Sequence, residues 1–307
     1  MTAVSGRVSR AEARDALLRS GYLLESRLET LLQKAAYYVE ANHSYPDPDT
    51  GKTRELDLFA MGAVKAGPRE RDFIFPVLLI ECVNNPQPLA LITKEPQVGF
   101  LHHQDVKHAG LPVKFQSEAR TWQPLPDYLS LDKFHHYCKG RVATQFCSFR
   151  QKKDQRNREW MALHEDAQFD CFRKLCAATD YFQDHHFKSW RFGGPEFVNI
   201  EFYYPVLVVA GELFEARPGR SSVRLARKSH LQFRRSEIVR GGAENYQIDV
   251  VTESFFPRYL RLVEGEVEAI ARRFRRRHKA VRAALDRIVR AARRLRSPDK
   301  IRGAFEY

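Results

Sequence analysis

The pattern of apolar and polar positions predicts a buried strand at Phe75–Asn84, which reads FPVLLIECVN. Charged residues precede this run, and asparagine and proline follow it. A short, almost continuous apolar run with such borders is typical of a strand that is buried on both faces. Because side chains alternate along a strand, Glu81 shares a face with Val77, Leu79 and Val83.

A carboxylate on such a face needs a partner. Placing an ionised Glu81 there costs several kcal/mol unless a cation or a donor compensates the charge, so a bound metal or a salt bridge is expected. A partly exposed strand end or a simple salt bridge is the more common explanation for a single acid. A second acid nearby would favour a metal site over these explanations.

The second acid is Asp57, in the strand-like run Arg54–Met61 that follows a turn-rich segment. Asp57 alternates with Phe59 and Met61, so it also points with apolar neighbours. Two adjacent strands that each carry one inward acid bring carboxylate oxygens to a shared divalent cation such as Mg²⁺.

A third acid lies on the helix expected from about Ala11 to Ala36. The apolar residues of this helix form a broad stripe at helical spacing. At about 100° per residue, Glu25 falls inside the stripe and Glu29 falls at its margin. Glu25 is therefore a further candidate for the same site.

This arrangement resembles the core of the PD-(D/E)XK nuclease superfamily, which has the restriction-endonuclease-like fold. The resemblance rests on a helix with Glu25, a hairpin strand with Asp57, and Glu81-Cys82-Val83 on the next strand. It covers residues 14–94 and, more loosely, the chain up to about residue 212. It implies a metal-dependent phosphodiesterase in which Asp57 and Glu81 hold Mg²⁺ or Mn²⁺, the backbone carbonyl of Cys82 assists, and Glu25 supports the site.

The sequence departs from the family pattern at Val83, where the family usually has a lysine. Such a lysine orients the attacking water and stabilises charge on the phosphate. Some members of the superfamily carry the lysine on a neighbouring element, and Lys94 is the nearest candidate here. A lysine at a strand end is otherwise simply solvated, and a site without the lysine could bind nucleic acid without cutting it. Carboxylates close together, with an amine from Lys94 or another lysine beside them, would indicate an active site.

The expected fold is α/β, with an αβββαβ core in which helices flank a mixed sheet. Additional strands are expected at about residues 202–210, 213–215, 225–233 and 246–251, with a bend at Gly211. Residues 1–10 are expected to be disordered, residues 11–255 to form the nuclease-like domain, and residues 256–307 to form a long arginine-rich helix and tail. Within the domain, a helical insertion is expected at about residues 129–190, with helices near 129–149 and 159–187.

The net charge of +13 is concentrated near the C-terminus. Residues 272–296 contain eleven arginines and one lysine against one acid, which accounts for +11. Because a solvated helix normally mixes acids with its bases, this bias favours a nucleic acid, with DNA as the expected partner. The candidate nucleic-acid-binding residues are Arg272, Arg273, Arg276, Arg277, Arg290 and Arg294. The apolar seam of this helix packs on the domain or pairs with a second copy.

Several other classes of protein are not expected. The sequence has no apolar run of about twenty residues and no secretory pattern, so a membrane partner is not expected and a cytoplasmic location is. The five cysteines lack paired spacing, and the three His-His pairs lack four ligands at a recognised zinc spacing.

The leading hypothesis is a metal-dependent nuclease. A catalytically inactive nuclease-like domain that binds nucleic acid is the alternative, and a protein-interaction scaffold that dimerises through its terminal helix is the third.

Overall fold

The structure, a computed structural model, describes residues 7–20, 22–48, 50–84, 87–96, 102–112, 114–116, 122–152, 159–164, 166–188, 197–239 and 242–295. Of the ten N-terminal residues that were expected to be disordered, residues 1–6 lie outside this set, and a helix begins at Arg10. In this part of the chain, no helix has both the length and the apolar composition needed to cross a membrane.

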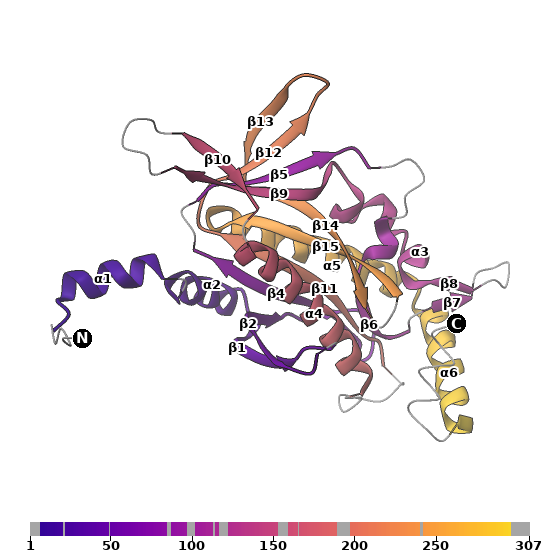
Figure 1. The fold of residues 1–307 in the computed structure, drawn as a ribbon. Helices are drawn as coiled ribbons and strands as arrows, with labels where there is room; N and C mark the ends of the chain where they lie inside the picture. The colour runs from indigo at the N-terminus through magenta and orange to yellow at the C-terminus, as the bar shows by residue number, and fades with distance from the viewer. Residues whose placement is uncertain are drawn as a thin grey trace.

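One 13-stranded mixed sheet organises the described residues (Figure 1). Its main path runs β1-β2-β4-β11-β15-β14-β9-β5-β12-β13, with β3, β6 and β10 attached to β4, β11 and β9. The strands are β1 Tyr38–Pro46, β2 Thr53–Met61, β3 Val64–Lys65, β4 Phe73–Val83, β5 Leu89–Lys94, β6 His108–Leu111, β9 Val142–Gln151, β10 Trp160–Leu163, β11 Asn199–Val209, β12 Leu213–Pro218, β13 Val223–Lys228, β14 His230–Val239 and β15 Gly242–Thr252. A separate small sheet pairs β7 Lys114–Gln116 with β8 Trp122–Pro124.

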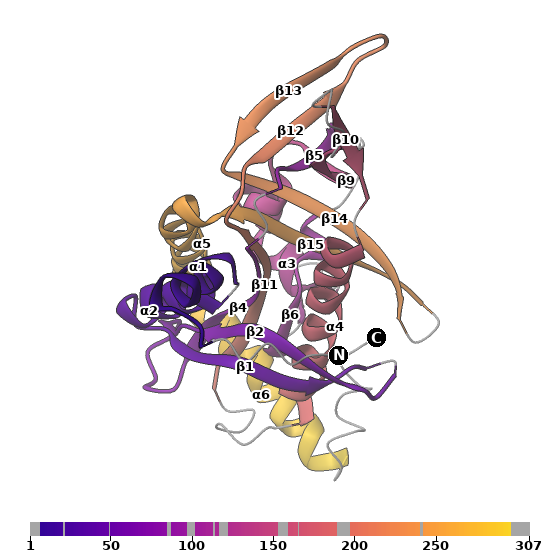
Figure 2. The same cartoon turned by 60° about the vertical axis from the view of Figure 1, so that its left-hand side comes forward.

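The helices lie on both faces of this sheet (Figures 1 and 2). They are α1 Arg10–Arg19, α2 Tyr22–Lys34, α3 Leu125–Leu129, α4 Asp166–Lys188, α5 Phe256–Arg276 and α6 His278–Leu295, and the short 3-10 helices are η1 His102–Asp105, η2 Leu131–Lys133, η3 His136–Cys138 and η4 Glu253–Phe255. The structure therefore confirms an α/β protein whose mixed sheet is flanked by helices.

Strand β4 lies between β2 and β11 and is buried on both faces, as its sequence predicts. Leu78 and Ile80 pack in a core that α2 and α5 close. Val77 and Leu79 pack on the opposite side, in a core that α4 closes. Glu81 therefore points to the α4 side, together with Val77, Leu79 and Val83, as the alternation indicated.

The strands around β4 run in both directions. Strand β2 is antiparallel to both β1 and β4, and β11 is parallel to both β4 and β15. The elements α2, β1, β2, β4, α4 and β11 follow one another in the order helix, three strands, helix, strand. Strands β5 to β10 are inserted between β4 and α4.

The helix predicted near residues 129–149 is wrong. Short helical turns occupy its first part, and β9 begins at Val142. Strand β9 is rich in aromatic and β-branched residues and pairs with β5, β14 and β10, so sheet pairing outweighs any helical tendency. The helix predicted at 159–187 is correct only from Asp166, because β10 precedes it.

The bend expected at Gly211 does not form a hairpin between β11 and β12. Strand β12 pairs with β5 and β13 instead of with β11.

The long terminal helix is two helices that meet at Arg277. This residue leaves the helical conformation, with φ −107° and ψ 21°. The apolar residues of the terminal helix recur every three or four positions, and Arg277 stands where the next apolar residue of this repeat would be expected. The apolar seam of α5, including Val263 and Phe274, is buried in the core that it shares with β4. The seam of α5 therefore packs across the body of the chain itself.

Candidate functional site

Asp57 and Glu81 lie opposite each other on neighbouring strands. The antiparallel ladder pairs Leu58 with Ile80, which places the next two residues, Asp57 and Glu81, across from one another. The Oδ2 atom of Asp57 accepts a hydrogen bond of 2.7 Å from the backbone N–H of Cys82. The two predicted carboxylates therefore belong to one site.

Glu81 is the most deeply buried acid of this site, with 1% of its surface exposed. Burial, and then the neighbouring charge of Asp57, raise the pKa of Glu81 to about 8. Its Oε1 atom is buried and has no hydrogen-bond partner. A carboxylate in this setting holds a proton near neutral pH unless a cation takes the place of that proton.

The amine beside these acids comes from Lys174 on α4. Its Nζ atom donates a hydrogen bond of 3.0 Å to Oε2 of Glu81. Lys94, the residue that the sequence suggested, is exposed at the end of β5, opposite Val142 of β9. The lysine that contacts the predicted metal-binding acid is thus Lys174 and not Lys94.

Glu25 lies at the edge of the same cluster. Its carboxylate is half-buried, and its pKa is raised by burial and by the charges of Asp57 and Glu55, while Lys174 acts in the opposite direction. The charge of Asp57 also acts on the Cys82 thiol. The structure therefore brings Glu25, Asp57, Glu81 and Cys82 together, and adds Lys174.

The donor set fits a hard divalent cation. The carboxylates of Asp57 and Glu81 offer oxygen ligands, and Oε1 of Glu81 is a buried atom that lacks a partner. The pKa of the Cys82 thiol is raised well above its ordinary value, first by burial, so the sulfur stays protonated. Only the backbone carbonyl of Cys82 could contribute, as the family resemblance implies.

The predicted nucleic-acid-binding arginines divide into two groups. Arg272, Arg276 and Arg290 are exposed. Arg273 packs on the ring of Phe134 at 3.8 Å, and Arg277 lies 4.8 Å from the ring of Tyr128 and donates to its carbonyl. Arg290 also donates from Nε to the carbonyl of Asp286 at 3.2 Å, so Arg273, Arg277 and Arg290 have contacts within the chain. The side chain of Arg294 lies outside the described residues.

The arginine-rich helix and the carboxylate site are on different faces of the sheet. Helix α5 closes one core and α4 closes the other, and Figure 2 shows strands between them. A second basic element is the β12–β13 hairpin, which follows β11 in the chain. Val209 at the end of β11 is opposite Val83, and the hairpin β12–β13 begins four residues later. Arg220 and Arg224 are exposed on this hairpin.

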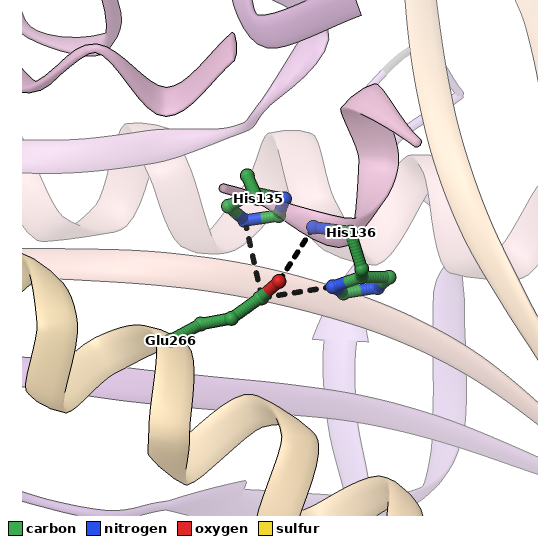
Figure 3. Close-up of side chains that lie close together, drawn as sticks. All are labelled: His135, His136 and Glu266. Carbon is green, nitrogen blue, oxygen red and sulfur yellow. Dashed lines mark hydrogen bonds and ion pairs between the residues drawn. The ribbon is translucent and has the colours of Figure 1, made fainter. Parts of the chain in front are cut away.

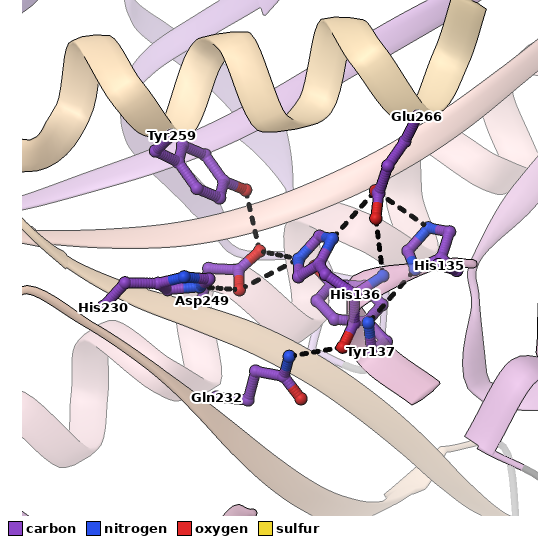
Figure 4. A network of polar contacts seen from close by, with 8 residues as sticks. All are labelled: His135, His136, Tyr137, His230, Gln232, Asp249, Tyr259 and Glu266. Atoms are coloured by element: carbon purple, nitrogen blue, oxygen red, sulfur yellow. Dashed lines mark hydrogen bonds and ion pairs between the residues drawn. The ribbon is translucent and has the colours of Figure 1, made fainter. Parts of the chain in front are cut away.

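A second polar cluster, not predicted from the sequence, lies under α5 (Figure 4). At its centre, Nδ1 of His136 is 2.8 Å from Oε2 of Glu266, and Nε2 is 3.0 Å from Oδ2 of Asp249. His230 Nε2 is 2.6 Å from Oδ1 of Asp249, and the hydroxyl of Tyr259 donates to Oδ2 at 2.7 Å. The cluster therefore ties η3 to β14, β15 and α5.

Charge pairing dominates the electrostatics of this second cluster. Burial opposes protonation of His136, but the carboxylates of Asp249 and Glu266 outweigh it and raise its pKa to about 10. Burial lowers the pKa of His135 to about 4, against the charge of Glu266. Figure 3 shows both rings beside Glu266. Nε2 of His135 lies 3.6 Å from Oε2 of Glu266 and has no hydrogen-bond partner.

One sequence signal could have revealed part of this cluster. Asp249 stands between Ile248 and Val250 in an apolar strand, which is the pattern that singled out Glu81. Glu266 likewise lies beside Val263 and Ile270 in the helical projection, at the margin of the apolar seam. The histidines carry no comparable signal, because their spacing in the sequence is irregular.

Comparison with known proteins gives no relative for this chain. No protein-family model, no curated protein and no solved structure matches it. Inferences about its function therefore depend on the geometry of the two clusters.

Proposed function

We propose that this chain is a metal-dependent phosphodiesterase that cleaves nucleic acid, with DNA as the expected substrate. The observation that carries the proposal is the placement of Lys174 against Glu81, opposite Asp57. Two carboxylates and an amine are the groups that the resemblance to PD-(D/E)XK nucleases requires, although here the amine comes from a different element. The order of α2, β1, β2, β4, α4 and β11 also supports a core of that type.

The residues have distinct roles in this proposal. Asp57 and Glu81 would hold Mg²⁺ or Mn²⁺, and Glu25 would add negative charge at the edge of the site. When bound, such an ion lowers the pKa of a coordinated water and polarises the scissile phosphate. Lys174 would orient the attacking water and stabilise the charge that develops on the phosphate.

The substrate class follows from charge. The net charge of +13 and the exposed arginines suit a phosphate backbone, which attracts bases without regard to sequence. Arg220 and Arg224, which are exposed at the turn end of the β12–β13 hairpin, would contact the phosphate backbone at a distance from the carboxylates. Arg272 and Arg276 on α5 would contact the same polymer on another face.

The test is cleavage of plasmid and single-stranded DNA with Mg²⁺ or Mn²⁺. Asp57→Asn, Glu81→Gln and Lys174→Met should each lower the cleavage rate at least about 100-fold, because each removes a group that acts on the transition state. Lys94→Met removes a lysine of the same length from outside the cluster and should keep the wild-type rate. Equal loss in the two lysine variants would contradict the role of Lys174.

A second candidate function is binding of nucleic acid without cleavage. Val83 favours it, because the usual motif lysine is absent from its strand. This function predicts salt-sensitive binding by the wild-type protein and no metal-dependent cleavage of any substrate. Cleavage that Glu81→Gln abolishes would exclude it.

A further inference from the structure

We propose that His136, His230 and Asp249 form a second metal site, which takes a divalent transition ion such as Zn²⁺. The three residues come from η3, β14 and β15 and meet beneath α5, on the sheet face opposite α4 (Figure 4). This site is separate from Asp57 and Glu81, and the inference does not depend on the proposed nuclease activity.

The donor atoms are close enough to share one ion. One ring nitrogen of each histidine and a carboxylate oxygen of Asp249 lie within 4.8 Å of one another, and in both rings Nε2 is the nitrogen that contacts Asp249. Zinc binds histidine nitrogen and carboxylate oxygen at about 2.0–2.2 Å, so ligands around one ion are roughly 3 to 3.5 Å apart. Small movements of the His230 and Asp249 side chains, now 2.6 Å apart, would open the space.

The buried charge also matches a divalent ion. Asp249 has 0% of its surface exposed and Glu266 has 6%, so two carboxylates lie in the interior. Two positive charges are needed to neutralise them, and a single divalent ion between His136 and Asp249 supplies both. Without the ion, the same balance requires protons on two histidines.

The surroundings orient the ligands. Once the ion replaces the Nε2 proton of His136, its Nδ1 still donates to Glu266 Oε2 at 2.8 Å, and the Nε2 lone pair faces the ion beside Asp249. Metal-binding histidines commonly hold a carboxylate in this way, which fixes the tautomer and the ring. Tyr259 in turn donates to Asp249 Oδ2 and fixes the carboxylate.

A neighbouring triad, His135, His136 and Glu266, is less suitable (Figure 3). Nδ1 of His135 accepts a hydrogen bond from the N–H of Tyr137 at 3.2 Å. In a neutral ring this places the proton on Nε2, so no lone pair faces Glu266. Glu266 therefore serves to orient His136 and is not itself a ligand.

Two nitrogen ligands and one oxygen select the kind of ion. Imidazole suits zinc, cobalt and related transition ions, whereas magnesium is bound by oxygen ligands. The ion would join η3 to the β14–β15 hairpin, and a water would complete tetrahedral coordination beside the three protein ligands. The Asp57 and Glu81 site, built from oxygens, would keep its preference for Mg²⁺ or Mn²⁺.

Cobalt tests this site directly in the full chain. The protein is stripped of metal with a chelator and titrated with Co²⁺, whose visible absorption becomes intense in a tetrahedral site. We expect one equivalent of tetrahedral Co²⁺ in the wild type, displaced by Zn²⁺, and a higher Tm with Zn²⁺ than without it. A wild-type protein that leaves Co²⁺ with the weak spectrum of the hydrated ion would overturn the proposal, and this readout needs no variant.

Variants then locate the ion. His230→Gln should abolish the tetrahedral spectrum, and Glu266→Gln should weaken Co²⁺ binding about 10- to 100-fold. His43→Gln, at a histidine that pairs with Glu40 on β1, should leave binding unchanged. Full Co²⁺ binding by folded His230→Gln would refute the site. Glu81→Gln should retain Co²⁺ even where cleavage is lost, so the two proposals can fail separately.

Discussion

Lys174 on α4 donates a hydrogen bond of 3.0 Å to Glu81 on β4, although 93 residues separate them in the sequence. The ammonium group does not keep Glu81 ionised, because burial and the charge of Asp57 outweigh it and raise the pKa of Glu81 to about 8. The metal-free site is therefore electrostatically unfavourable at high pH. A bound cation would compensate the buried charge of Glu81. The cost of that charge in the metal-free protein can be measured as a change in stability with pH, without any assay of activity.

Glu81→Gln should stabilise the metal-free protein at high pH. The folded-state pKa of Glu81 is raised from 4.5 to about 8, so between these values the folded protein binds more protons than the unfolded chain. Its stability therefore falls as pH rises through this window, and glutamine removes the effect. The free energy of unfolding, from urea titrations at pH 5 and pH 8.5, should favour the variant by on the order of 4 kcal/mol more at the higher pH.

Glu70→Gln is the control for this prediction, because Glu70 is exposed and its replacement removes the same charge. Its stability should follow the wild type at every pH. If the gap between wild type and Glu81→Gln were the same at both pH values, Glu81 would not be a buried acid with a raised pKa.

Replacement of Arg272 and Arg276 together by glutamine should make DNA binding less dependent on salt. Each phosphate contact releases counterions and contributes about 0.9 to the slope of log K against log salt concentration. Two lost contacts should therefore lower the slope by roughly 1.8. Fluorescence anisotropy with labelled DNA at several salt concentrations measures this slope for the metal-free protein.

Arg258 and Arg261 provide the matched control, since both are exposed on the same helix, outside the arginine-rich segment. Their double replacement changes the net charge equally and should leave the slope close to that of the wild type. Equal effects of the two double variants would mean that α5 contributes only its overall charge and makes no localised contact.

Local pattern was enough to predict the strands that carry the acids. The runs around Asp57 and Glu81 are short, apolar and clearly bounded, and each lies in a strand of the structure. The side chain of Glu81 lies on the face that the two-residue period predicts, with Val77 and Leu79. These predictions succeed because the neighbours that decide burial are adjacent in the sequence.

The amine could not be found in this way. Lys174 stands next to buried Leu175 on α4, but nothing in its own segment indicates that the helix crosses over Glu81. That contact depends on how the sheet and the helix pack. The strand β9 was missed for a related reason, because its pairing with β5 and β14 involves residues far away in the chain.

The buried histidines show the same limit. Asp249 was visible as an acid in an apolar strand, yet its partner His136 lies 113 residues earlier and meets it only after the sheet has formed. Rules of ligand spacing apply to motifs within one segment. They do not detect a site assembled from η3, β14 and β15.

The coupling between Asp57 and Glu81 gives a final prediction. Asp57→Asn keeps an oxygen that can accept the hydrogen bond from Cys82, but it removes the charge that, after burial, does most to raise the pKa of Glu81. The pKa of Glu81 should then move toward its ordinary value. Glu81→Gln should therefore change the free energy of unfolding less between pH 5 and pH 8.5 when it is made in the Asp57→Asn protein than when it is made in the wild type. We call this pH-dependent change the Glu81 gap. Urea unfolding of the four metal-free proteins across pH 5 to 8.5 measures both gaps.

Asp180→Asn is the matched control for that cycle. Asp180 is a carboxylate on α4 that accepts a hydrogen bond from Tyr246, and burial raises its own pKa to about 6. It is not among the charges that act most strongly on Glu81, so its replacement should leave the Glu81 gap unchanged. If Asp57→Asn had no more effect on the gap than Asp180→Asn, Asp57 and Glu81 would titrate independently. Two carboxylates that do not sense each other's charge are too far apart to share one divalent ion, so this result would remove the basis of the proposed metal site without any substrate being tested.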